Sequence, residues 1–170
     1  MKTRLRLRDP SAHSRRTSLP TKLFSAAFAI VALSVMPVLA AGASPDDKAA
    51  SEVALKFINQ YADYSDSRGF QCDARWVKKF PLCTPEFGKM LEAFHAHWNK
   101  INPIVGFGAD PVVSSNGGVP RDFTIKSIKV TGEQARAIAL GDKSFPMEFP
   151  IILVKRNGKW LVDGSGELAK

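Results

Sequence analysis

The sequence predicts an α+β domain in which two to three N-terminal helices pack on a four-stranded antiparallel meander. Apolar residues recur at helical spacing in the first half of the chain, whereas they alternate with polar residues in the last third. Asn157-Gly158 separates two of the alternating runs and indicates a β-hairpin, because both central positions of its turn favour a positive φ. Such a sheet must bury one face, and the amphipathic helices are the available cover.

The first helix is predicted over residues 46–64. Ser44-Pro45 provides a capping hydroxyl followed by proline at the first helical position, and acidic residues follow in the first turn. A second, short helical piece is expected after Asp73, which is placed to cap it, and Pro81 ends it. These signals place two helices before the main amphipathic segment.

The strongest amphipathic helix is predicted over residues 85–100. It begins with Thr84-Pro85-Glu86, which repeats the order of cap, proline and acid. Its apolar stripe has spacings of four, three, four and three residues, and consists of Phe87, Leu91, Phe94, Trp98 and Ile101.

Four strands follow in the last third. The first is expected around 123–130 with one irregular step, and the second around 135–140, after a turn at Thr131-Gly132. The third and fourth are expected at 149–154 and 160–162. This order predicts a meander of sequential antiparallel neighbours.

Residues 1–43 have the three parts of a secretory signal, with a basic segment to Lys22, an apolar segment over 23–38 and small residues before a cleavage site after Ala43. An uncleaved membrane anchor is the alternative, since about 20 apolar residues cross a bilayer. Ser14-Arg15-Arg16 leaves the twin-arginine and general secretory routes both open. We expect an exported, periplasmic or secreted protein.

The predicted mature chain, residues 44–170, is one globular domain with nearly balanced charge. From Ser44 onward it has seventeen Lys and Arg against fifteen Asp and Glu, a net charge of +2, although the full chain has +8. The basic excess belongs to the signal segment, so the charge does not indicate a nucleic-acid partner. We expect membrane contact only through the signal segment, if it is not cleaved.

Cys72 and Cys83 are the only cysteines of the chain. An even number in an exported protein predicts a disulfide, which would close a short loop and stabilise the fold by about 3 kcal/mol. Two free thiols and half of a metal site are the alternatives. A zinc site needs three or four ligands, and only His95 and His97 remain in the mature chain, so we predict neither a metal nor another cofactor.

Candidate catalytic residues are few. Tyr61 and Asp63 lie near the end of the first helix, and acid–base chemistry would require such a group to face His95 in an apolar pocket. His95 and His97 lie on different sides of their helix, so they do not share a ligand. The chain has no Gly-x-Ser-x-Gly, His-Glu-x-x-His or phosphate-loop motif. We therefore expect no catalytic activity, with Tyr61, Asp63 and His95 as weak candidates.

Residues 103–120 form a long connection with four glycines and three prolines. Its apolar residues are costly to leave in water, so they either line the mouth of a pocket or form a patch that a partner covers. A poorly ordered surface loop is the alternative. The expected partner surface, with two charged residues as a polar rim, consists of Ile104, Val105, Phe107, Asp110, Val112, Val113 and Arg121.

The C-terminal segment Ile152–Asp163 (ILVKRNGKWLVD) resembles the closing hairpin of nuclear transport factor 2-like domains. Residues 53–61 (VALKFINQY) are similar to the first helix of that group, and residues 82–87 (LCTPEF) to the start of its next. Within the group, the chain most resembles the exported domain-of-unknown-function family 3828. The resemblance covers residues 48–165 and departs at the glycine-rich stretch 106–118 and the alanine-rich strand 135–139.

The resemblance implies a curved sheet wrapped on helices to form a cone with a pocket. It assigns no catalytic residue, because this fold hosts enzymes, binding modules and inhibitors. We therefore expect an exported binding or interaction domain without catalytic activity, and by fold-level analogy an inhibitor or immunity-type protein. A protein or a small apolar molecule is the expected partner. A small pocket enzyme of the isomerase or hydratase type is the alternative.

Overall fold

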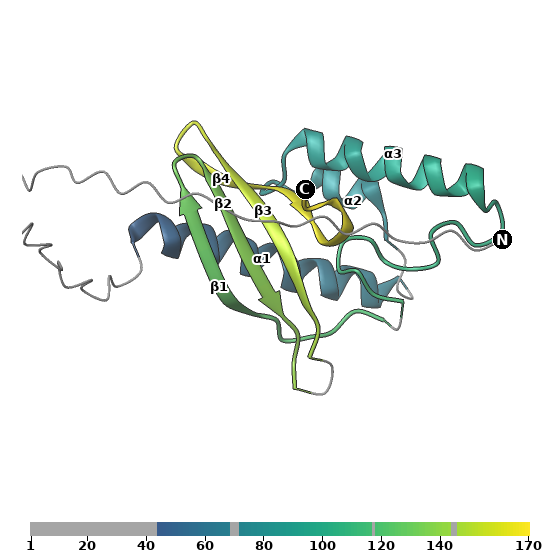
Figure 1. The fold of residues 1–170 in the computed structure, drawn as a ribbon, viewed down its shortest axis with the longest axis horizontal. Coiled ribbons are helices and arrows are strands. Elements are labelled where there is room, and N and C mark those ends of the chain that lie inside the picture. The colour runs from purple at the N-terminus through teal and green to yellow at the C-terminus, as the bar shows by residue number, and fades with distance from the viewer. Residues whose placement is uncertain (1–43, 69–71, 117, 144–145) are drawn as a thin grey trace, which may run out of the picture. The chain divides into compact units, whose positions relative to one another are not determined.

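In the described part of the chain, three helices precede four strands (Figure 1). The computed structural model describes residues 44–68, 72–116, 118–143 and 146–170, so the predicted signal peptide lies outside the described residues. The elements are α1 (Pro45–Ser67), α2 (Ala74–Lys79), α3 (Pro85–Ile101), β1 (Thr124–Thr131), β2 (Gln134–Leu140), β3 (Glu148–Arg156), β4 (Lys159–Ser165) and the 3-10 helix η1 (Gly166–Leu168). This order confirms the α+β prediction with three N-terminal helices.

All three helices begin at the predicted capping residues. The Ser44 hydroxyl accepts a hydrogen bond from the Asp47 N–H at 3.0 Å, and the Asp47 carboxylate accepts one from the Ser44 N–H at 2.8 Å. Asp73 and Thr84 accept bonds from backbone N–H groups in the first turns of α2 and α3. Each cap pairs an N–H group that the helix itself leaves unpaired. Among the described helices, none combines the length and the apolar character needed to span a membrane.

The sheet is an antiparallel meander in the order β1-β2-β3-β4. The irregular step expected in the first strand is a register shift between Ile125 and Ser127. The β3–β4 turn has Asn157 at φ 52° and Gly158 at φ 76°, as the type I′ prediction requires. The chemistry of these short segments therefore sets the register of the meander.

Helix α1 runs across one face of the sheet and contacts all four strands (Figure 1). On β2 that face presents only Ala135, Ala137 and Ala139, and all three are buried. Ala50 and Ala54 of α1 are fully buried as well. Because these side chains are small, the helix can approach the sheet closely. The alanine-rich strand is thus part of the helix–sheet interface.

Aromatic rings join the three helices. Phe57 of α1 lies 5.9 Å from Phe87 of α3, measured between ring centroids, and Tyr61 lies 5.5 Å from Trp76 of α2. Trp76 stacks on Phe80 at 4.6 Å. These contacts fix α2 and α3 relative to α1. They also fix the ring of Tyr61, which packs between Phe57 and Trp76.

The segment before α3 runs beside the outer edge of β4. The Val162 N–H donates to the Leu82 carbonyl at 2.7 Å, and the Thr84 N–H donates to the Val162 carbonyl at 2.9 Å. Cys83 lies between these two bonds in an isolated bridge with Val162. The edge of the sheet is therefore partly paired, which protects it from pairing with other chains.

The close approach of α1 to β2 yields a prediction. Ala137→Leu should lower the free energy of unfolding by about 1–3 kcal/mol, because the larger side chain has no space beneath the helix. The matched control Ala93→Leu lies on an exposed part of α3 and should change it by less than about 0.5 kcal/mol. Urea unfolding followed by circular dichroism measures both. Equal stability of the two variants would show that α1 and β2 are not closely packed.

Candidate functional site

The connection between α3 and β1 contains a tight, ordered turn. Asp110 and Ser115 form an antiparallel bridge, with N–H to carbonyl distances of 2.6 and 3.1 Å. Between them, Val112 and Val113 are completely buried. This part of the predicted loop therefore belongs to the core, and these two residues are not available as a partner surface.

Asp110 links the turn to α1. Its Oδ2 atom accepts a hydrogen bond of 2.6 Å from the Tyr61 hydroxyl, and its Oδ1 atom accepts one of 2.8 Å from the Val112 N–H. Asp110 is only 7% exposed and Tyr61 is fully buried. A carboxylate can be buried when both of its oxygens are hydrogen-bonded, and here both oxygens are.

The C-terminal segment holds the same turn from its other side. The Ser165 hydroxyl donates to the Val112 carbonyl at 2.7 Å, and the Glu167 N–H donates to the Pro111 carbonyl at 2.9 Å. Gly166 has φ 58°, and a Cβ atom there would lie 2.3 Å from the Pro111 carbonyl oxygen. A glycine is therefore required at the point where η1 approaches the turn.

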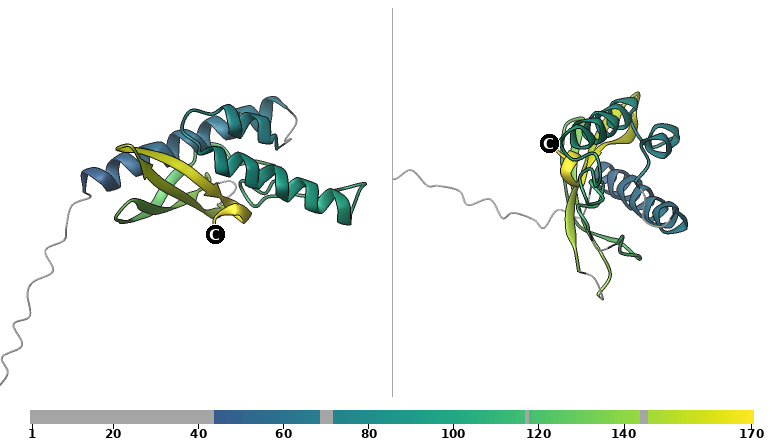
Figure 2. Two further views of the ribbon diagram at one scale, coloured as in Figure 1. Left: turned by 90° about the horizontal axis from the view of Figure 1, so that it is seen from above. Right: turned by 90° about the vertical axis from the view of Figure 1, so that its right-hand side faces the viewer.

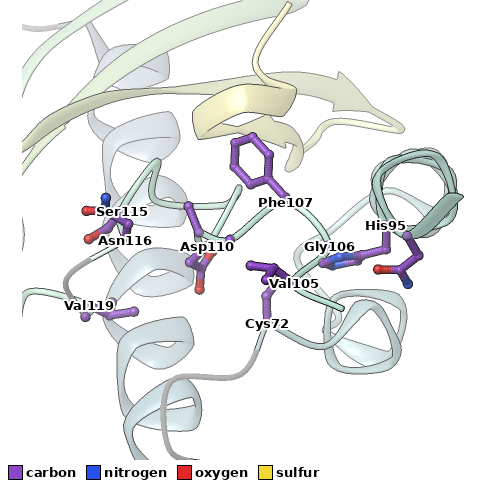
Figure 3. Close-up of a pocket in the computed structure, with 13 residues that line it drawn as sticks. Cys72, His95, Val105, Gly106, Phe107, Asp110, Ser115, Asn116 and Val119 are labelled. Carbon is purple, nitrogen blue, oxygen red and sulfur yellow. The ribbon is translucent and has the colours of Figure 1, made fainter. Parts of the chain in front are cut away.

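A pocket of about 380 Å³ opens beside this turn. Figure 3 shows Asp110, Cys72 and Val105 between α1 and α3, with His95 extending from α3 toward Gly106. Polar groups of the lining are His95, Asn99, Asp110, Ser115 and Asn116, and apolar groups are Val105, Phe107 and Val119. The pocket can therefore receive a molecule with both a polar and an apolar part.

Burial dominates the electrostatics of this site. It raises the pKa of Asp110, although the hydrogen bonds from Tyr61 and the Val112 N–H partly oppose it. Burial also raises the pKa of Tyr61 well above its ordinary value, with Cys72 and Asp110 adding to the shift. The pKa of Cys72 is raised to about 12 by burial and by the charge of Asp110. At neutral pH, Tyr61 and Cys72 therefore keep their protons.

His95 lines the pocket, and one nitrogen atom of its ring, Nε2, is buried without a hydrogen-bond partner among the described residues. An electrostatic interaction with His95 acts on Asp110, so the two groups are close enough to influence each other. Because Nε2 is buried, a ligand in the pocket can bond to it only after the ring turns this atom toward the pocket.

Two of the three weak catalytic candidates lie at this site. Tyr61 reaches it through Asp110, and His95 lines the pocket directly. Asp63 is exposed and is not among the lining residues. His97 is exposed as well, as its position on the helix predicts. In the described part of the chain, no group of three or more His, Cys, Asp or Glu side chains is arranged to hold a metal ion.

The predicted disulfide is not formed in this structure, in which Cys72 and Cys83 are both free thiols. Cys72 lies in the pocket beside Asp110 and Tyr61, whereas Cys83 bridges to Val162 at the edge of β4. Burial alone raises the pKa of Cys83. The two thiols therefore have different neighbours.

The predicted partner surface is divided by the fold. Ile104 and Val105 are exposed, at 95% and 62%. Phe107 is half-buried against Phe94 and Trp98. Asp110, Val112 and Val113 are buried. Arg121 forms an ion pair with Asp66 at the end of α1, so it does not form a rim around the exposed pair.

The hydrogen bond between Tyr61 and Asp110 could not be predicted from local pattern. The residues are 49 positions apart, and Tyr61 falls on the apolar stripe of its helix. One signal was available: Asp110 lies between Ala109 and Pro111-Val112-Val113, and an acid in so apolar a run requires a partner.

The buried hydroxyl yields a prediction for stability. Tyr61→Phe should lower the free energy of unfolding by about 1–3 kcal/mol at neutral pH, because it leaves a buried carboxylate oxygen without its donor. Tyr64→Phe is the matched control. Its hydroxyl donates at 3.0 Å to Asp73, which Arg75 also pairs, and we expect a loss below about 1 kcal/mol. Equal losses in urea unfolding would contradict the role of the Tyr61 bond.

The raised pKa of Asp110 yields a prediction for pH dependence. In the unfolded chain the Asp110 carboxyl loses its proton above its ordinary pKa of 3.8, whereas in the folded protein it keeps the proton to higher pH. The contribution of Asp110 is therefore full below about pH 3.8 and declines as pH rises through its raised pKa. Asp110→Asn cannot titrate. The stability of the wild type minus that of the variant should fall as pH rises above the ordinary value of 3.8, and a difference that rises would be contrary.

We compared the chain with known protein families, curated proteins and solved structures. No family model, no curated protein and no solved structure matches the chain.

Proposed function

We propose that the protein is an exported binding domain without catalytic activity, and that its ligand occupies the pocket between α1, α3 and residues 103–120. The single observation that carries this proposal is a pocket of about 380 Å³ whose wall combines polar side chains, His95 among them, with apolar ones. Export itself rests on the signal-like residues 1–43.

The ligand we propose is a small amphipathic molecule. Its polar group would bond to His95 and to the amides of Asn99 or Asn116, and its apolar part would contact Val105 and Phe107. The sequence led us to expect a protein or a small apolar molecule as partner; we propose an amphipathic molecule because polar groups form much of the lining.

The pocket enzyme of the isomerase or hydratase type has less support. Such an enzyme needs a group that gains and loses a proton near neutral pH. The raised pKa values of Tyr61 and Cys72 hold both groups protonated, and the Asp110 carboxylate is occupied by two hydrogen bonds. Tyr61 and Cys72 therefore act at this site through packing and hydrogen bonds, and an enzyme would have to rely on His95 or Asp110 for proton transfer.

We further propose that the domain is a nuclear transport factor 2-like cone. The proposal is supported by three helices before a four-stranded antiparallel meander, and by α1 lying across one face of that sheet. It is also supported by the type I′ turn at Asn157-Gly158 within the segment that carries the resemblance.

A test uses 1-anilinonaphthalene-8-sulfonate, a fluorescent probe with an apolar body and an anionic group. We expect one saturable site on the wild type, and an affinity about tenfold lower for His95→Ala, because one hydrogen bond to a charged group is lost. His97→Ala is the matched control, two residues away on the same helix but outside the pocket, and should bind as the wild type does.

Two outcomes would contradict the proposed binding site. One is the absence of saturable binding, and the other is an equal effect of His95→Ala and His97→Ala. Because the probe also binds exposed apolar surface, Ile104→Asp is measured in parallel and should leave the saturable site intact.

A further inference from the structure

Three large apolar side chains are exposed in the described part of the chain, and they lie within five residues of one another. We call them the apolar tip: Ile101 at 59% exposure, Ile104 at 95% and Val105 at 62%. Scattered exposed apolar residues are ordinary, but a group of them marks an interaction site. In Figures 1 and 2 the C-terminal end of α3 and the loop after it lie at one end of the domain.

The apolar tip is held in place by hydrogen bonds. The Asn102 side-chain oxygen accepts from the Ile104 N–H at 3.3 Å and from the Val105 N–H at 3.2 Å. The Gly106 N–H donates to the Asn102 carbonyl at 2.8 Å, and Gly106 has φ 65°. This turn directs the side chains outward, so their exposure is built into the local structure.

Aromatic packing supports the turn from beneath. Phe107 lies 4.8 Å from Phe94 and 5.2 Å from Trp98, measured between ring centroids. Trp98 is half-buried and lies on the last turns of α3, directly before the apolar tip. Tryptophan at this position, with an apolar body and a polar N–H, is typical of side chains at the boundary between lipid and water.

One cation lies next to the apolar tip. Residues 93–109 contain Lys100 and no acid. The flanking acids are engaged elsewhere, since Glu92 pairs with Lys78 and Asp110 is buried on Tyr61. An apolar tip beside a lysine, with no acid in the same segment, is complementary to an anionic lipid surface.

We propose that the apolar tip inserts into the boundary between head groups and acyl chains of an anionic bilayer. Ile104 and Val105 would enter the apolar layer, Trp98 would lie at head-group level, and Lys100 would face the lipid phosphates. The insertion is shallow, because the tip consists of three side chains. Val105 also lines the pocket, so docking would bring the pocket mouth to the lipid surface. The proposal stands without any assumption about the pocket ligand.

The test places a tryptophan on the apolar tip of the full chain. Ile104→Trp is mixed with vesicles of phosphatidylethanolamine and phosphatidylglycerol that contain brominated acyl chains, which quench tryptophan on contact. Lys159→Trp, in the exposed β3–β4 turn, is the matched control. Both variants carry the same residues 1–43, so binding through that segment affects them equally. Emission is measured as the difference from the wild type.

We expect the tryptophan from Ile104→Trp to shift to the blue and to be quenched, while the one from Lys159→Trp is not. Adding Val105→Asp to the Ile104→Trp chain should weaken this quenching about tenfold or more, because a charge replaces an inserted apolar group. Replacing phosphatidylglycerol by phosphatidylcholine should weaken it as well.

Three results would overturn the proposal. Equal quenching of both introduced tryptophans would mean that the apolar tip does not face the bilayer. Quenching of neither would point to a protein partner for the tip. A blue shift that depends on protein concentration without vesicles would instead identify a second copy of the chain as the occupant.

Discussion

The short hydrogen bond between Tyr61 and Asp110 is the constraint on which the rest of the site depends. It joins a helix at the start of the domain to a turn 49 residues later, in surroundings that exclude water. With its second oxygen on the Val112 N–H, Asp110 allows a polar turn to lie in the core. Val112 can then be buried, and the C-terminal residues Ser165 and Gly166 have a surface on which to pack.

The pocket is a consequence of this arrangement. Residues 110–115 are held against α1, while residues 102–107 are held against α3 by the Asn102 turn and by the packing of Phe107. The space between the two halves of the connection is lined by His95 and by the backbone of several glycines. Tyr61 and Asp110 at the base are hydrogen-bonded to each other and Asp110 also to the Val112 N–H, so the hydrogen-bonding groups left for a ligand lie in the wall.

Local signals accounted for most of the fold. Ser44, Asp73 and Thr84 cap the three helices as predicted, and the irregular step in β1 is a register shift. For the candidate site, the sequence indicated Tyr61 and His95 as residues to examine, but it also indicated Asp63, which is exposed. It placed Asp110 at a surface rim, although the side chain is buried, because an aspartate in a glycine-rich loop is usually solvated.

The sequence by itself determined the elements, their order and the antiparallel meander, because caps, turn residues and apolar periodicity act over a few positions. Only the tertiary structure decided which long-range partners meet. The predicted pairing of Cys72 with Cys83 is not formed here: Cys72 lines the pocket, whereas Cys83 bridges to Val162 at the edge of β4. Likewise, residues 103–120 divide into a buried turn and an exposed apolar tip. That division depends on where α1 and η1 offer hydrogen bonds to the turn, and no spacing within the segment encodes it.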